Sequence, residues 1–422
     1  MPDRRTGAQR AGVNERGSFR GVFRVGEFQA LWWAQVLSIM GDQLARVALT
    51  LLVFARTHSA ALTALTYALT FLPDLFGGPL LSGLADRYPR RTVMVVTDVA
   101  RAVLVGLMAV PGMPLAVVCV LLVIVQLLAS PFNAARGAVL PAILDGDLFV
   151  AGQAVINITY QIGQLGGYVA GGALVAFTGS HVALAIDAAT FVASAVLVRL
   201  GLVHRPVPAG EHTTSRTTLA SLRAGATLVW RNRALRALVT LACVAGFYVV
   251  AEGLSVPYAR ELGGGAVTAG LLFAANPAGT VIGMTVLTRL VSPDRRLRLL
   301  GPLAVLSCAV LVLCALRPNL VATLVVWAVS GAATSFQTVA AAAFVRAVPD
   351  SGRGQAFGLA STSLRVSQGL GVVIAGALAQ GWAPSTVVAV AGGVGAGVAI
   401  LAAASWYRAH VGLASTVAES PA

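Results

Sequence analysis

Twelve apolar runs, most of them 20 to 28 residues long, divide most of this chain and limit its fold more than any other feature. An α-helix needs about 20 apolar residues to cross the hydrocarbon core of a bilayer. The runs are 30–54, 61–84, 92–111, 114–136, 150–177, 182–202, 236–258, 266–289, 297–316, 320–345, 355–380 and 384–406. We therefore predict an all-α polytopic membrane protein with twelve transmembrane helices.

The composition excludes a soluble enzyme and a disordered chain. Hydrophobic residues make up 57% of the chain and charged residues only 11%, whereas soluble domains carry about 25% charged residues. The net charge is +14, but the arginines lie between the apolar runs, so they indicate membrane orientation and no nucleic-acid partner. The four cysteines fall inside apolar runs, at spacings that fit neither a zinc site nor a disulfide framework. We expect no cofactor and no metal.

Polar segments divide the chain into five predicted parts. These parts are a cytoplasmic arginine-rich tail at 1–27, an N-terminal six-helix bundle at 28–203, a cytoplasmic linker at 204–234, a C-terminal six-helix bundle at 235–408 and a cytoplasmic tail at 409–422. Apolar residues recur at helical spacing inside the linker, which predicts an amphipathic helix there. Such a helix lies in the membrane surface or serves as a plain connector, and the sequence leaves both readings open.

The placement of the arginines predicts which side of the membrane each loop faces. With the N-terminus inside, 24 arginines fall on the inner side, 3 on the outer side and 3 within the spans. Cytoplasmic loops carry such an excess of basic residues. We expect a multi-pass protein of the cell inner (plasma) membrane with both termini cytoplasmic, which requires an even number of spans.

The two halves of the chain resemble each other. Residues 160–174 align with residues 364–378, so that Gln164 falls on Gln368, Gly167 on Gly371 and Gly172 on Gly376. Helices rich in Gly and Ala also align by chance, but the Arg90–Arg91 pair recurs at Arg295–Arg296 with nearly the same offset. A duplicated six-helix unit is how many secondary transporters are built, with the binding site at the repeat interface. We predict two pseudo-symmetric six-helix bundles.

The loop after the second run carries a motif, Gly83-Leu-Ala-Asp86-Arg87-Tyr-Pro-Arg90-Arg91. It resembles the cytoplasmic signature of the major facilitator superfamily, with Pro89 in place of that signature's second Gly. Segments 31–48, 133–141 and 348–358 resemble the branch that contains the enterobactin exporter and macrolide efflux proteins. The resemblance covers about residues 28–408. It implies a transporter of two six-helix bundles, and more narrowly an exporter.

The resemblance also implies a conformational latch between the two halves. In the family the motif's Asp is held by a nearby Arg and by the N-terminus of the eleventh helix, where free N–H groups favour a carboxylate. Arg136 is our candidate partner for Asp86. The alternative is an inside-facing turn whose arginines only set topology. The predicted cytoplasmic latch comprises Gly83, Asp86, Arg87, Arg90, Arg91 and Arg136.

Ionisable residues within the bilayer are expensive, so each one is a candidate for function. Our candidates for binding protons or cargo are Asp42, Arg46, Asp74, Glu252 and Arg365. Asp42 and Arg46 are four residues apart and share a helix face, so this pair is equally compatible with a structural role. Asp98 and Arg101 are three residues apart, and we expect their pair to be structural. Asp187 lies near the outer end of its run, where it can reach water.

Glutamines occupy matching positions in the fifth and eleventh runs. We expect Gln161, Gln164 and Gln368 to line a central cavity, and interhelical hydrogen bonding is the alternative. The fifth run also resembles the glycine-rich pattern of exporters, with Tyr168 in place of its Pro. The glycines at 163, 166, 167, 171 and 172 in this run predict close helix packing.

These features favour a proton-coupled exporter, an antiporter of a small amphipathic molecule such as a drug, siderophore or secondary metabolite, that works by alternating access. An importer of a small solute on the same scaffold is the alternative. A membrane sensor or enzyme is a remote third, because the sequence contains no nucleophile–base set, metal cluster or phosphate-binding loop. The expected partners are a small-molecule substrate, protons and the lipid bilayer, and the expected oligomeric state is a monomer.

Overall fold

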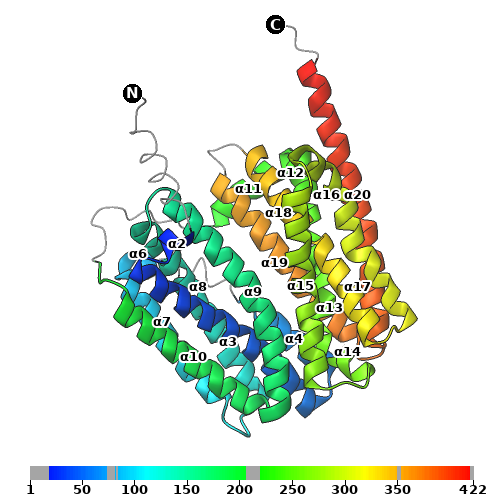
Figure 1. Cartoon of the computed structure of the whole chain (residues 1–422). Helices are drawn as coiled ribbons and strands as arrows, with labels where there is room; N and C mark the ends of the chain where they lie inside the picture. The colour runs from blue at the N-terminus through cyan, green and yellow to red at the C-terminus, as the bar shows by residue number, and fades with distance from the viewer. Residues whose placement is uncertain (1–18, 74–80, 82–83, 206–218, 349–352, 419–422) are drawn as a thin grey trace, which may run out of the picture. The chain divides into compact units, whose positions relative to one another are not determined.

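The computed structural model describes residues 19–73, 81, 84–205, 219–348 and 353–418. This part of the chain consists of helices and contains no strand (Figure 1). Each of the twelve predicted runs contains helix. The predicted all-α polytopic membrane fold is therefore confirmed.

Eight helices of the described residues are long and apolar enough to cross a membrane by length and composition. The other predicted spans coincide with α4 (Ala60–Leu69), α7 (Arg90–Met108), α9 (Asp147–Thr178) and α19 (Arg353–Leu378). The second predicted span, 61–84, runs past α4 into residues outside the described part, and α7 carries four charged residues. Together these helices are consistent with twelve crossings.

The chain divides into two compact units. The first comprises 1–48 and 76–215, and the second comprises 49–75 and 216–422. Residues 49–75, which we predicted to belong to the N-terminal bundle, thus group with the second unit. The reason is local packing: α4 lies against α19, where a side chain at Gly376 would meet Ala64.

The first unit is built from one short and several long helices. They are α2 (Phe19–Val22), the first part of α3 (Gly26–Thr57), α6 (Leu84–Arg87), α7, α8 (Leu115–Ile143), α9 and α10 (Ser180–Gly201). The glycines of α9 allow close packing against α3, as predicted: a Cβ at Gly167 would lie 2.8 Å from Cβ of Gln43, and one at Gly171 would lie 3.1 Å from Cα of Leu44. A further glycine, Gly179 with φ +82°, makes the turn between α9 and α10.

The second unit contains α4 and the helices after the linker. These are α11 (Leu219–Arg231), α12 (Arg233–Cys243), α13 (Ala245–Gly253), α14 (Ser255–Glu261), α15 (Ala266–Leu290), α16 (Pro293–Ala309), the 3₁₀ segment η1 (Val310–Leu316), α17 (Leu320–Ala333), α18 (Phe336–Ala347), α19 and α20 (Pro384–Ala418). Asn232 and Asn319 begin α12 and α17 by accepting hydrogen bonds from backbone N–H groups of the first turn. The predicted linker helix is present as α11, and its Gly225 packs against the backbone of Gln355 in α19.

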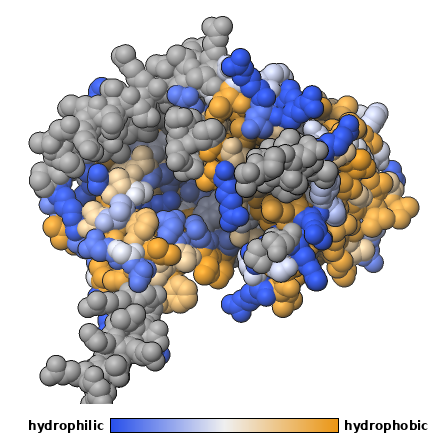
Figure 2. Space-filling model, turned by 90° about the horizontal axis from the view of Figure 1, so that it is seen from above, coloured by the Kyte–Doolittle hydropathy of each residue, from blue (hydrophilic) through white to orange (hydrophobic). Residues whose placement is uncertain are grey.

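Large apolar side chains remain exposed on both units. The exposed fraction is 85% for Phe177, 81% for Leu200 and 79% for both Leu290 and Leu316. Hydrophobic residues also occupy much of the face shown in Figure 2. Exposed apolar surface on this scale indicates a hydrophobic surrounding, and the bilayer supplies it.

Candidate functional site

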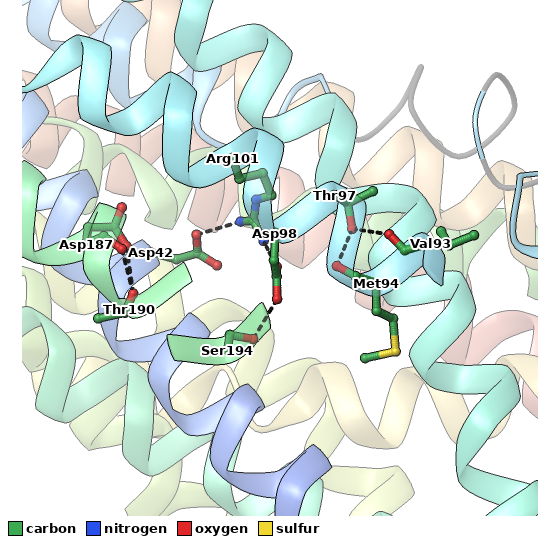
Figure 3. Close-up of polar contacts among 9 residues, drawn as sticks. All are labelled: Asp42, Val93, Met94, Thr97, Asp98, Arg101, Asp187, Thr190 and Ser194. Atoms are coloured by element: carbon green, nitrogen blue, oxygen red, sulfur yellow. Dashed lines mark hydrogen bonds and ion pairs between the residues drawn. The ribbon is translucent and has the colours of Figure 1, made fainter. Parts of the chain in front are cut away.

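A buried charge cluster joins three helices of the first unit (Figure 3). Nη2 of Arg101 on α7 lies 2.8 Å from Oδ1 of Asp42 on α3, and its Nη1 lies 3.9 Å from Oδ1 of Asp98. The other Asp98 oxygen accepts a 2.6 Å hydrogen bond from the hydroxyl of Ser194 on α10. Arg101 is only 2% exposed, so its guanidinium stabilises two carboxylates in surroundings where an uncompensated charge is costly.

The α10 helix completes this cluster. The ring of Phe191 lies 4.0 Å from the centre of the Arg101 guanidinium, a geometry that stabilises a cation. Asp187 is 1% exposed, and its Oδ1 accepts a 3.3 Å hydrogen bond from the Thr190 hydroxyl. The expectation that Asp187 reaches water is therefore wrong, because α10 turns this residue toward α3, where a Cβ on Gly41 would overlap its carboxyl.

Asp42 and Arg46 of α3 both reach partners on other helices. Asp42 makes its ion pair with Arg101 across helices, and Nη1 of Arg46 donates a 2.9 Å hydrogen bond to the hydroxyl of Tyr168 on α9. Tyr168 is fully buried and stands where the exporter pattern has Pro. Arg46 is one turn from Asp42 on the same helix, and its long side chain extends to the hydroxyl on α9.

A second polar contact lies in the second unit. The Tyr67 hydroxyl on α4 donates a 2.5 Å hydrogen bond to Oε2 of Glu252 on α13. The Tyr67 ring stacks on Phe273 of α15, with ring centres 5.7 Å apart, and meets the edge of Phe71 at 5.7 Å. Tyr67 is 2% exposed. The rings of Phe71 and Phe273 thus hold the Tyr67 ring in the position from which its hydroxyl donates to Glu252.

Tyr67, Tyr168 and Ser194 were not predicted from the sequence as members of these clusters. A tyrosine within an apolar run buries its ring and seeks a partner for its hydroxyl, which is a signal for the first two. Ser194 gives no such signal, since a serine in a membrane helix commonly bonds to its own backbone.

The remaining candidates are placed only in part. Arg365 and Gln368 lie on α19, and Gln161 and Gln164 on α9, all four partly exposed. The two pairs belong to different units, so their sharing of a cavity stays a prediction. Asp74 lies outside the described residues.

Two arginines of the predicted latch, Arg90 and Arg91, make contacts within the first unit. Arg90 donates a 2.7 Å hydrogen bond to the Ala138 carbonyl of α8, and Arg91 donates to the Arg199 carbonyl in the last turn of α10. A cation is favoured near such a helix C-terminus. Arg87 is exposed at the end of α6, and Arg136 is half-buried on α8. Gly83 and the Asp86 side chain lie outside the described part, so the Asp86–Arg136 contact stays a prediction.

An ion pair also fastens the start of α3 to the segment after α10. Nη1 and Nη2 of Arg205 lie 2.6 and 2.9 Å from the two carboxylate oxygens of Glu27. This bidentate pairing raises the pKa of the Arg205 guanidinium above its usual value.

A cavity of about 430 Å³ opens between helices of the second unit. Most of its lining is apolar, with Met284, Leu287 and Trp406 among the residues, and Arg296 and Arg346 supply positive charge. A site of this kind suits a ligand with a substantial apolar surface.

The all-helical fold and the buried intramembrane charges define a membrane protein of the transporter type. The model of the Major Facilitator Superfamily matches residues 31–317 and 253–421. The chain belongs to the Major Facilitator Superfamily, and its long apolar helices make it a multi-pass membrane protein.

Two relatives from Bacillus subtilis (strain 168) are similar in sequence. The uncharacterized MFS-type transporter YvqJ is 25% identical over 264 residues, which cover 60% of this chain and 63% of that protein. The uncharacterized MFS-type transporter YfiS is 28% identical over 166 residues, which cover 39% of this chain and 40% of that protein. The chain thus aligns with less than two thirds of the length of either relative.

Solved structures share the fold at low sequence identity. The nucleoside transporter NupG has a TM-score of 0.69 at 18% identity, with 89% of this chain and 99% of that chain covered. A POT family transporter in complex with a thioalcohol-conjugated peptide has a TM-score of 0.72 at 10% identity, with 90% of this chain and 96% of that chain covered. A bacterial homologue of the human lysosomal transporter Spinster has a TM-score of 0.68 at 13% identity, with 91% of this chain and 96% of that chain covered.

Proposed function

We propose that this transporter is a proton-coupled exporter of a small amphipathic molecule, an antiporter that works by alternating access. The observation that carries the proposal is the 2.5 Å hydrogen bond from Tyr67 to Glu252. A carboxylate inside a membrane span is costly and marks a proton or substrate pathway. Glu252 is such a group, and its partner comes from a different helix.

The contact between Tyr67 and Glu252 supplies a way to couple protonation to movement. An ionised Glu252 accepts the Tyr67 hydrogen bond as a charge-assisted bond, which is stronger than a bond to a neutral acid. Proton binding at Glu252 therefore weakens the hold of α13 on α4, and proton release restores it. This difference in contact energy between the two protonation states is what a coupled conformational change requires.

The driving force is sufficient for export. One proton that enters down a membrane potential contributes about 2.3 kcal/mol per 100 mV. Since about 1.4 kcal/mol corresponds to a factor of ten, one proton supports a gradient of roughly fiftyfold for a neutral solute. A pH difference across the membrane adds to this value.

The cargo class follows from chemistry rather than from the fold. The solved structures named above include a nucleoside transporter and a POT family transporter in complex with a thioalcohol-conjugated peptide, so the shared fold does not indicate one cargo. The apolar lining of the 430 Å³ cavity supports an amphipathic cargo. The resemblance of 31–48, 133–141 and 348–358 to the enterobactin-exporter and macrolide-efflux branch favours a drug, siderophore or secondary metabolite.

Several further predictions belong to this proposal. The proton or cargo pathway that includes Glu252 also uses Asp42, Arg46, Asp74 and Arg365. The central cavity is lined by Gln161, Gln164 and Gln368. The latch motif with Asp86 and Arg136 favours the outward-open state. The protein acts as a monomer with both termini in the cytoplasm. Import of a small solute is the second candidate function, since the same scaffold serves both directions.

The test is transport by energised inside-out vesicles with a panel of amphipathic compounds. We expect uptake of at least one compound that a protonophore abolishes and that Glu252→Gln reduces to background. Asp147→Asn is the matched control, because Asp147 is an exposed carboxylate at the start of α9. Transport that ignores the protonophore, or that survives in Glu252→Gln, would refute the proposal. Accumulation only in right-side-out vesicles would establish import.

A further inference from the structure

The buried charge cluster of the first unit is one positive charge short of neutrality. Within the described residues, the ionisable groups at this depth are three carboxylates and two guanidinium groups: Asp42, Asp98, Asp187, Arg46 and Arg101. Arg136 of α8 lies elsewhere, two residues from the Ala138 carbonyl that Arg90 reaches from the start of α7. An uncompensated buried charge is so costly that such a group changes its protonation instead. One bound proton makes the cluster neutral.

Two of the three carboxylates share the Arg101 guanidinium as their ion-pair partner. Asp42 faces Arg101 at 2.8 Å. Asp98 faces Arg101 at 3.9 Å and accepts the 2.6 Å hydrogen bond from Ser194. Both contacts favour the ionised form of the acid.

Asp187 lacks such a partner. No guanidinium in the described part of the chain lies within 4.0 Å of its carboxyl, and the hydroxyl of Thr190 reaches it only at 3.3 Å. Its charged neighbours are Arg101 and the like-charged Asp42, and Figure 3 draws Asp42 between Asp187 and Arg101. Asp187 is also 1% exposed. Of the three acids it therefore gains least from ionisation.

The packing around Asp187 makes its charge state matter for α3. A Cβ on Gly41 would overlap both Oδ1 of Asp187 and the Thr190 hydroxyl, so the backbone of α3 lies directly against this carboxyl. Two further buried atoms of the cluster, Oδ1 of Asp98 and Nε of Arg101, have no hydrogen-bond partner. The cluster thus holds an unused acceptor and an unused donor that a change in protonation can engage.

We propose that the carboxyl of Asp187 is a proton-binding site inside the first unit, distinct from Glu252, whose proton keeps the contact between α3, α7 and α10 neutral. Release of this proton places a negative charge against the α3 backbone at Gly41 and loosens the contact between α3 and α10. The use of this site in transport rests on the proposed proton coupling, whereas its occupancy does not.

Infrared spectroscopy of the purified protein tests the occupancy directly. At neutral pH exposed carboxylates are ionised, so a protonated carboxyl gives an isolated carbonyl band. We expect such a band in the wild type, with an isotope shift after labelling with ¹³C-carboxyl aspartate. We expect its loss in Asp187→Asn and its survival in Glu252→Gln. Because an amide matches a neutral acid in shape, Asp187→Asn should keep the wild-type unfolding midpoint.

Each other outcome would overturn the assignment. A wild-type spectrum without an aspartate-shifted band excludes a bound proton on any aspartate, and this measurement needs no variant. A band that persists in Asp187→Asn, or that disappears in Asp74→Asn or Asp98→Asn instead, places the proton elsewhere. Failure of Asp187→Asn to fold contradicts a neutral acid at this position. Transport that ignores a protonophore defeats the proposed function but leaves the band, so the two failures are distinguishable.

Discussion

Replacement of Arg101 by methionine should destabilise the first unit by about 3 kcal/mol. The change removes the ion pairs to Asp42 at 2.8 Å and to Asp98 at 3.9 Å, together with the contact with the Phe191 ring at 4.0 Å. Removal of one partner from a buried pair typically costs about 3–5 kcal/mol. Asp98 is fully buried, but the Asp42 side chain is 30% exposed, so water relieves part of the cost and places the value at the lower end.

Thermal unfolding of the detergent-purified protein measures this loss. We expect a lower midpoint for Arg101→Met and a smaller decrease for Arg101→Lys, which keeps a charge but not the planar fork that reaches two carboxylates. The double variant Arg101→Met with Asp42→Asn should recover part of the loss, because it removes one of the stranded charges. A midpoint for Arg101→Met equal to that of the wild type would refute the reasoning that the cluster is a desolvated ion network.

Three other predictions address the remaining parts of the account. Tyr67→Phe removes the hydrogen-bond donor to Glu252, and a hydrogen bond to a charged group contributes about 1.5–3 kcal/mol. Transport in vesicles should therefore fall about tenfold or more, while the purified variant keeps a normal elution profile. Unchanged transport would contradict the role of this contact. Gly279→Val should lower the free energy of unfolding by about 3 kcal/mol through overpacking, because the new side chain would overlap the Ala328 backbone. Gly354→Ala is the control, since a side chain there meets nothing within 4 Å. Equal unfolding midpoints for the two variants would contradict close packing of α15 on α17. Green fluorescent protein fused to either terminus should fluoresce, because it folds in the cytoplasm, and a dark fusion at one end only would imply an odd number of crossings.

The fold could be predicted from the sequence because it depends on the length and apolarity of consecutive runs of residues, which can be read directly along the chain. Runs long enough to cross a bilayer leave few alternatives to a helix, since every backbone group must be satisfied within the segment. The glycines of α9 likewise predicted close packing, which the structure shows between Gly167 and Gln43. The grouping of 49–75 with the second unit could not be predicted, because it depends on which helix α4 packs against.

The site could be predicted only in its composition. The sequence identified Asp42, Asp98 and Arg101 as intramembrane charges, and spacing predicted the Asp98–Arg101 pair that the structure contains. Spacing along one helix cannot reveal a partner on another helix. The ion pair of Asp42 with Arg101 on α7 could therefore not be predicted. Asp187 is buried because of the rotation of α10, which no local pattern specifies.

Simultaneous measurement of proton and cargo movement tests the central claim most directly. Proteoliposomes are loaded with a pH-sensitive dye and exposed to an inward gradient of a transported compound, without any imposed pH difference. An antiporter must release internal protons as cargo enters, so we predict internal alkalinisation in step with uptake in the wild type and in Asp147→Asn, and none in Glu252→Gln. Cargo entry without a pH change, or with acidification, would contradict proton-coupled export.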